Sequence, residues 1–201
     1  MMHPRYVLLA AALLAACGSE PSGDAVGRSV PDSAAATAAP DSVPQDAGPA
    51  RGAPAITLAA DGLELSGGGG APRRLAFGAP RARVLADVGA VLGEPREQGM
   101  QEECPAGPLY QASYAGGLQL SFQDSAFVGW FAQEGSALRT APGVGPGSTL
   151  GELKAAYPAT KVEETSLGHE FDAGELWGIV TDTTGAGQVQ VMFAGINCIF
   201  R

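Results

Sequence analysis

The sequence predicts an α+β fold with two tandem units, each a helix followed by an antiparallel sheet, after a cleaved leader and a disordered stalk. Three observations predict it. The chain has an uncharged apolar run close to its first residue, continues with a segment rich in Pro, Ala, Ser and Gly, and then alternates between helical and strand periodicity. The third part, residues 56–201, is long enough to form one domain around a hydrophobic core.

The leader is residues 1–16. Met1 to Arg5 ends on a positive charge, and Tyr6–Ala16 contains no charged residue. This length fits the apolar region of a secretory signal and is shorter than the ~20 apolar residues that cross a bilayer. The run ends in Leu-Ala-Ala followed by Cys17. The alternative is a plain secretory signal with a cysteine at this place by chance.

The sequence Leu14–Cys17 resembles the lipobox of bacterial lipoproteins. This resemblance implies that the Cys17 thiol receives a diacylglyceryl group, that the chain is cut between Ala16 and Cys17, and that the new amino terminus is acylated as well. Each buried methylene contributes ~0.8 kcal/mol, so two or three acyl chains would make the membrane anchor effectively permanent. The protein would then face the periplasm or the cell exterior. Because neither Gly18 nor Ser19 is Asp, the family's sorting habit favours the outer membrane in a cell with two membranes.

The chain has three cysteines, and the lipid would use one of them. The other two, Cys104 and Cys198, are expected to form a disulfide in an oxidising compartment. This bridge would close a loop of about 95 residues, worth ~4–5 kcal/mol in the chain-entropy model. The alternative is a pair of buried thiols. A zinc site is not expected, because the two cysteines lack the C-x-x-C spacing.

Residues 17–55 are predicted to be the lipidated cysteine and a disordered linker. From Gly18 to Ala55 the chain has no Leu, Ile, Met, Phe, Tyr or Trp. Such a segment buries too little apolar surface to offset the entropy cost of ordering. A flexible chain of this length spans ~35 Å and would hold the domain clear of the membrane. The alternative is a segment that binds a partner or carries sugar.

Two helices are expected in residues 56–201. The first runs from about Pro80 to Leu92, because Pro suits a first turn and an apolar stripe follows at helical spacing. The second runs from about Thr149 to Tyr157, where Thr149 and Glu152 have capping-box spacing.

The strands are expected where apolar and β-branched residues alternate between turn residues. A hairpin is predicted around Asp61-Gly62. The other predicted strands are Gln111–Tyr114, Leu118–Phe122, Phe127–Phe131, Leu176–Thr181, Val189–Ala194 and Cys198–Phe200.

The order helix, strands, helix, strands suggests an internal duplication, with repeats at about residues 75–137 and 138–201. Two triplets of residues share one spacing, and a Trp adjoins the glycine in each: Phe122, Phe127 and Gly129, and Phe171, Leu176 and Gly178. The alternative is coincidence among residues that are common in strands.

The helix start Gly147–Leu153 has the pattern Gly-x-Ser/Thr-x-x-Glu-Leu, with one more residue of spacing than the simplest form of this pattern. It resembles two groups of proteins. One is the β-lactamase-inhibitor protein, built from two helix-plus-sheet units, and the other is the small lipoprotein of the outer-membrane β-barrel assembly machine, which has one. The resemblance covers about Leu75 to Arg201. It implies a protein-binding scaffold without catalysis, and no site residues are carried over from it.

The composition argues against an enzyme and against nucleic-acid binding. The formal net charge is −9 at pH 7, which repels nucleic acid and anionic lipid surfaces. One of the two histidines, His3, lies in the leader, so His169 would have to serve any histidine-based mechanism. The sequence has no Gly-x-Ser-x-Gly motif, and the remaining cysteines are expected to be oxidised. No catalytic residue, cofactor or metal is therefore expected.

Two candidate sites remain. Trp130 and Trp177, with Phe127 and Phe131, are candidates for a binding patch, although aromatic residues at strand spacing more often form a core. A divalent-ion site is the other candidate, and its alternative is a solvated strand face. Alternation in a strand would put His169 and Phe171 on one face, which separates the histidine from two of the candidate carboxylates. The candidate ion ligands are Glu163, Glu164, His169, Glu170 and Asp172.

The leading hypothesis is therefore a lipid-anchored, non-enzymatic protein of the cell envelope that binds a protein or a cell-wall component. The alternative is a lipoprotein that binds a small ligand or a divalent ion. The third hypothesis is a cell-wall hydrolase that works with paired carboxylates.

Overall fold

A computed structural model describes residues 55–67 and 71–200 of the chain. The predicted leader, Cys17 and the predicted stalk up to residue 54 lie outside the described residues. The described part begins with the first strand, at Ala55.

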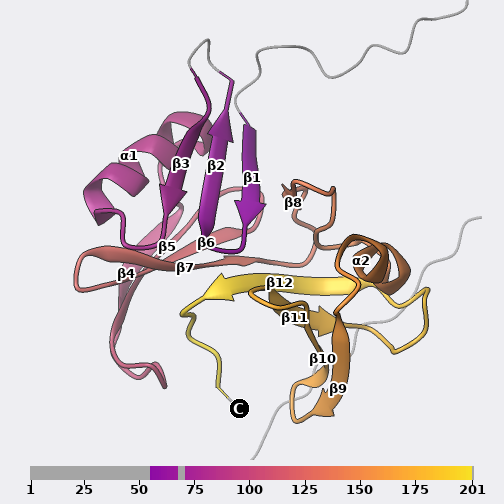
Figure 1. The fold of residues 1–201 in the computed structure, drawn as a ribbon. Helices are drawn as coiled ribbons and strands as arrows, with labels where there is room; N and C mark the ends of the chain where they lie inside the picture. Colours follow the sequence, from indigo (N-terminus) through magenta and orange to yellow (C-terminus); the bar gives the residue numbers. More distant parts are fainter. Residues whose placement is uncertain (1–54, 68–70, 201) are drawn as a thin grey trace, which may run out of the picture. The chain divides into compact units, whose positions relative to one another are not determined.

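The described residues form two sheets and two helices (Figure 1). The helices are α1 (Arg81–Leu92) and α2 (Leu150–Ala156). The four-stranded sheet has the order β3 (Arg73–Ala76), β2 (Gly62–Ser66), β1 (Ala55–Ala59) and β8 (Arg139–Thr140). The eight-stranded sheet has the order β4 (Glu97–Gln101), β5 (Leu109–Ser113), β6 (Leu118–Gln123), β7 (Ala126–Ala132), β12 (Val189–Gly195), β11 (Trp177–Val180), β10 (Gly168–Asp172) and β9 (Lys161–Thr165).

The predicted α+β class of tandem helix-plus-sheet units is wrong, because the described residues are mostly β structure. Helices of 12 and 7 residues stand against twelve strands. Two physical reasons explain the error. The strands β4 and β9 are polar and give no apolar alternation. In addition, β7 pairs with β12, so strands from both halves of the chain make one continuous sheet.

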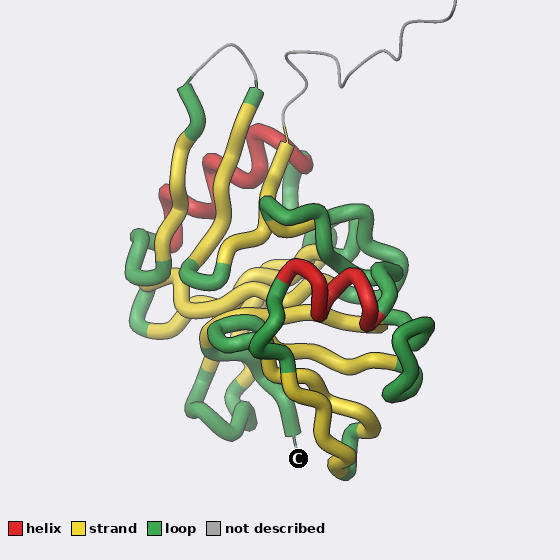
Figure 2. Tube along the Cα trace, turned by 45° about the vertical axis from the view of Figure 1, so that its right-hand side comes forward, coloured by secondary structure: helices red, strands yellow, loops and turns green. Residues whose placement is uncertain are grey.

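The eight-stranded sheet has one covered face and one open face. In both views α1, the four-stranded sheet and α2 lie on the same side of it (Figures 1 and 2). The Trp130 indole on this side is fully buried and donates a 2.8 Å hydrogen bond to the Ala59 carbonyl in β1. We call this side the covered face and the opposite side the open face. The hydrophobic core lies against the covered face and includes Leu58, Leu63, Leu75, Val84, Val88, Leu120, Trp130, Leu150, Leu153 and Met192.

Both predicted helices are confirmed. Pro80 precedes α1, and Val84 and Val88 are its fully buried residues. Thr149 caps α2 in a capping box, in which its side chain accepts from the Glu152 amide and the Glu152 carboxylate accepts from the Thr149 amide. These two bonds satisfy amide groups that a helix start otherwise leaves without partners. The hydrogen bond from the Thr149 amide is also the first cause that lowers the pKa of the Glu152 carboxyl.

The hairpin around Asp61-Gly62 and all but one of the predicted strands are confirmed. The predicted strand Cys198–Phe200 is wrong, because strand pairing ends at Gly195 and the chain then leaves the sheet. Gly195 has φ of 69°, a backbone conformation that favours glycine. We call residues 196–200 the C-terminal segment.

The two triplets that suggested a duplication occupy different places in the sheet. Phe122 and Phe127 face each other across β6 and β7, whereas Phe171 lies in β10 and faces Gly178 in β11. The two glycines, Gly129 and Gly178, also lie at positions that face opposite sides of the sheet. A Cβ at Gly178 would overlap the Val191 carbonyl oxygen and the Phe171 ring, which lies on the covered face, and a Cβ at Gly129 would overlap the backbone of Ile196. The shared spacing therefore has a different structural cause in each triplet.

Candidate functional site

Three aromatic rings lie side by side across the centre of the open face. Phe131 pairs with Phe193 across β7 and β12, and Phe193 pairs with Trp177 across β12 and β11. The Phe131 and Phe193 rings are nearly parallel, with centroids 5.7 Å apart and planes at 7°. The Trp177 and Phe193 rings are 6.4 Å apart with planes at 24°. We call these three residues the aromatic ladder.

The aromatic ladder lies on a face that no second sheet or helix of the described residues covers (Figure 1). Phe193, in the middle, is 7% exposed, while Phe131 and Trp177 are half-buried. Cross-strand aromatic pairs stabilise a sheet, but large apolar groups on an uncovered sheet face are also typical of interaction surfaces. The ladder is thus the part of the open face that is best suited to bind another molecule.

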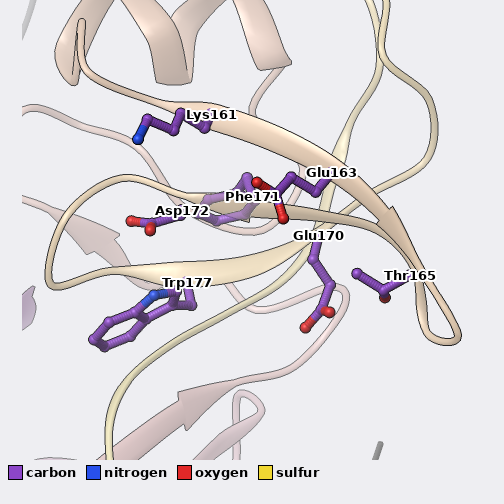
Figure 3. A pocket seen from close by; sticks show the side chains of 7 residues that line it. All are labelled: Lys161, Glu163, Thr165, Glu170, Phe171, Asp172 and Trp177. Carbon is purple, nitrogen blue, oxygen red and sulfur yellow. The ribbon is translucent and has the colours of Figure 1, made fainter.

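A pocket of about 390 Å³ adjoins the Trp177 end of the ladder (Figure 3). Its side chains project from three neighbouring strands, because Trp177 faces Asp172 on β10 and Asp172 faces Lys161 on β9. Glu163 and Glu170 face each other one step along the same strands. The residues that line this Trp177 pocket are Lys161, Glu163, Thr165, Glu170, Phe171, Asp172 and Trp177.

The C-terminal segment borders another part of the ladder. The Ile196 amide donates a 2.8 Å hydrogen bond to the Val128 carbonyl, and Asn197 accepts a 3.4 Å bond from the Ser121 hydroxyl. The Cys104–Cys198 disulfide, with a Cα–Cα distance of 4.9 Å, joins this segment to the loop before β5. The predicted cysteine pair is therefore present in the structure. A second pocket of about 460 Å³ lies between this segment and the rings of Trp177 and Phe193.

The side of the open face that β4, β5 and β6 form is polar. Gln119 faces Phe131 and also Ser113, and its amide donates a 3.2 Å hydrogen bond to the Ser113 hydroxyl. Gln111 and Ser121 make the next cross-strand pair. The open face therefore combines an apolar centre with an amide-rich flank and a carboxylate-rich flank, the apolar core and polar rim of a typical interface.

The structure separates the predicted aromatic patch. Trp130 and Phe127 are fully buried on the covered face and belong to the core. Trp177 and Phe131 lie on the open face with Phe193, a residue that the sequence analysis did not single out. Residues 189–194 of β12 are apolar at most positions on both faces, so their pattern could not say which side chains face outwards.

The five candidate ion ligands are also divided between the faces. Glu163, Glu170 and Asp172 lie on the open face, whereas His169 lies on the side of Phe171, as strand alternation predicted. Glu164 faces His169. Within residues 55–67 and 71–200, no group of three or more His, Cys, Asp or Glu side chains is arranged to hold a metal ion. The chemistry of the open face is therefore that of apolar contact, amide hydrogen bonds and negative charge.

Comparisons with known proteins gave no match: no family model fits the chain, and no curated sequence or solved structure is significantly similar to it. The resemblances to bacterial lipoproteins, to the β-lactamase-inhibitor protein and to the small lipoprotein of the β-barrel assembly machine stay predictions. In the described part of the chain, neither helix has the length and apolar character needed to span a bilayer.

Proposed function

We propose that this chain is a lipid-anchored protein of the cell envelope that binds another protein through the open face of its eight-stranded sheet. It binds without catalysing a reaction, and acyl chains on Cys17 hold it to the membrane. Its domain faces the periplasm or the cell exterior.

The observation that supports a binding role is the aromatic ladder of Phe131, Phe193 and Trp177 on a sheet face that no layer of the described residues covers. Aromatic residues contribute large contact areas with few rotatable bonds, and they are enriched among the residues that dominate binding energy. The polar flanks on either side match the rim that surrounds such residues in protein interfaces.

The Cys104–Cys198 disulfide supports a location outside the cytoplasm, because disulfides persist in oxidising compartments. The leader that ends at Cys17 supports the same location and supplies the anchor. Intact-mass analysis of the native protein tests the anchor. A mass that fits cleavage before Cys17 plus acyl chains is expected, and an uncleaved, unmodified chain would contradict it.

Photo-crosslinking in the cells that make the protein tests the binding role. A photoreactive amino acid at Gln119 would lie on the open face beside Phe131, and one at Ala86 would lie at an exposed position of α1, which packs on the covered side. We expect a discrete protein adduct from position 119, no such adduct from position 86, and loss of the adduct when Trp177→Ala is combined with the probe at 119. Equal adducts from both positions, or none from position 119, would rule out binding by the open face.

A further inference from the structure

We infer that the Trp177 pocket receives a lysine or arginine side chain of the protein partner, with arginine bound more tightly. This inference rests on the proposed function and adds the chemistry of the partner at one end of the aromatic ladder. Three steps lead to this inference: the free face of the Trp177 indole, the charge around it and the shape of the cation.

The first step is the orientation of Trp177. One face of its indole packs toward Phe193, with the two planes at 24°. Its other face is therefore directed to the opposite neighbour, β10, where Asp172 is its cross-strand partner. Figure 3 shows the indole at one side of the pocket, with the Asp172 carboxylate on the same side and the Glu170 carboxylate on the other side. A group in this pocket would meet the π-face of an indole and carboxylate oxygens together.

The second step is the charge of the pocket. Asp172 and Glu163 supply two carboxylates, against one ammonium group, that of Lys161. Lys161 faces Asp172 across β9 and β10, yet no ion pair joins either side chain to another described residue. Asp172 does accept a 2.8 Å hydrogen bond from the Gly174 amide, which fixes its carboxylate beside the pocket. The pocket thus carries an excess of negative charge, which favours a cation and repels an anion.

The third step is the choice of cation. Lysine and arginine cations are attracted to the face of an indole, and arginine also binds carboxylates through two parallel hydrogen bonds. A guanidinium group already packs on a ring in this fold, because the Arg81 guanidinium carbon lies 4.2 Å from the centroid of the Tyr110 ring. A metal ion fits less well, since Ca²⁺ takes six to eight oxygen ligands and the indole offers none. The pocket therefore suits an organic cation on a side chain.

Calorimetric titration of the full mature chain with four blocked hexapeptides tests the inference. The peptides contain arginine, lysine, citrulline or glutamate. Citrulline has nearly the shape of arginine without its charge, so it separates charge from shape. We expect saturable binding of the arginine peptide, weaker binding of the lysine peptide, and no binding of the citrulline or glutamate peptides.

Three variants locate the binding. Trp177→Ala is expected to weaken arginine-peptide binding about tenfold, which corresponds to the loss of one cation–π contact of about 1.4 kcal/mol. Asp172→Asn removes one charge from the pocket and is also expected to weaken it. Glu134→Gln removes one charge from an exposed turn and is the matched control for net charge. It is expected to change the affinity by less than about twofold, as exposed charges interact weakly across screened distances.

Two results would overturn the inference. One is equal binding of the citrulline and arginine peptides, and the other is an equal loss of affinity in Asp172→Asn and Glu134→Gln. Near-ultraviolet circular dichroism of each variant, with the buried Trp130 as internal reporter, shows whether the fold is kept. If the Gln119 probe still gives a Trp177-dependent adduct while these titrations fail, the proposed function stands and the cationic partner is excluded.

Discussion

Trp130 and Trp177 lie on opposite faces of one sheet. Trp130 in β7 is fully buried and donates its indole N–H to the Ala59 carbonyl, which ties the large sheet to the small one. Trp177 in β11 is half-buried on the open face and stacks on Phe193. One tryptophan therefore belongs to the core and the other to the surface that we propose for binding.

This difference predicts opposite effects of the two substitutions. Trp130→Ala is expected to lower the free energy of unfolding by about 3–5 kcal/mol, because it opens a cavity in the core and leaves the Ala59 carbonyl without its donor. Trp177→Ala is expected to cost less, about 2 kcal/mol, because it removes one aromatic pair and the burial of a side chain that is still partly exposed. Urea denaturation followed by far-ultraviolet circular dichroism measures both. Similar losses in the two variants would contradict the assignment of the faces.

The disulfide is expected to hold the C-terminal segment in place and to stabilise the domain. The double variant Cys104→Ser, Cys198→Ser is expected to lose up to about 4 kcal/mol, because the bridge closes a long loop in the unfolded chain. Thermal unfolding of the oxidised, the reduced and the double-serine protein measures the effect. A melting temperature that is the same in all three would show that the bridge contributes nothing.

Gly129 is expected to be required for the path of the C-terminal segment. A Cβ atom at this position would overlap the Ile196 carbonyl oxygen, so Gly129→Ala forces backbone to move and is expected to cost about 1–3 kcal/mol. Gly89 in α1 is the matched control, because a Cβ there meets nothing within 4 Å. Gly89→Ala is expected to stabilise the protein by about 0.5–1 kcal/mol through its higher helix propensity. Chemical denaturation measures the unfolding free energy of both variants. An unchanged stability of Gly129→Ala would contradict the close approach of the Ile196 backbone to Gly129.

Tyr114 is expected to make the protein sensitive to alkaline pH. Its hydroxyl is buried without a hydrogen-bond partner among the described residues, and burial, followed by the nearby Glu94, raises its pKa to about 12. In the unfolded chain the pKa of a tyrosine is about 10. The stabilisation is therefore complete below pH ~10 and is lost as the pH rises toward ~12, because the unfolded state then binds fewer protons.

Tyr114→Phe is the variant that isolates this effect. It removes the titrating hydroxyl and keeps the ring, so its unfolding free energy at pH 7 is expected to stay close to that of the wild type or to exceed it. Between pH 10 and 12 the wild type is expected to lose more stability than the variant, by up to about 2 kcal/mol. Equal slopes of unfolding free energy against pH in the two proteins would show that Tyr114 does not titrate in this way.

The sequence correctly predicted those parts of the fold that depend on residues close together in the chain. The capping box of Thr149 and Glu152, the start of α1 after Pro80 and the Asp61-Gly62 turn depend on residues a few positions apart. The Cys104–Cys198 disulfide was predicted from the number of cysteines, because one of the three was expected to carry lipid and only these two remained.

The parts that depend on long-range pairing could not be predicted in the same way. Strand β9, with the sequence Lys-Val-Glu-Glu-Thr, lies at the edge of the sheet, where charged side chains are common because they hinder pairing with another chain. Its own sequence does not identify it as a strand, and its pairing with β10 does. The aromatic ladder needs the registers of β7, β12 and β11 together. A shift of one residue in any of them would turn Phe131, Phe193 or Trp177 to the other face.

The affinity of the partner for ladder variants tests the central claim most directly. The protein that the Gln119 probe captures would be purified and titrated against the full chain, against Phe131→Ala and Trp177→Ala, and against Ala86→Ser on α1 as the control. We expect each ladder variant to raise the dissociation constant roughly 30-fold or more, about 2 kcal/mol, with Ala86→Ser unchanged. Unchanged affinity in both ladder variants would contradict the claim that the open face of this sheet is the binding surface.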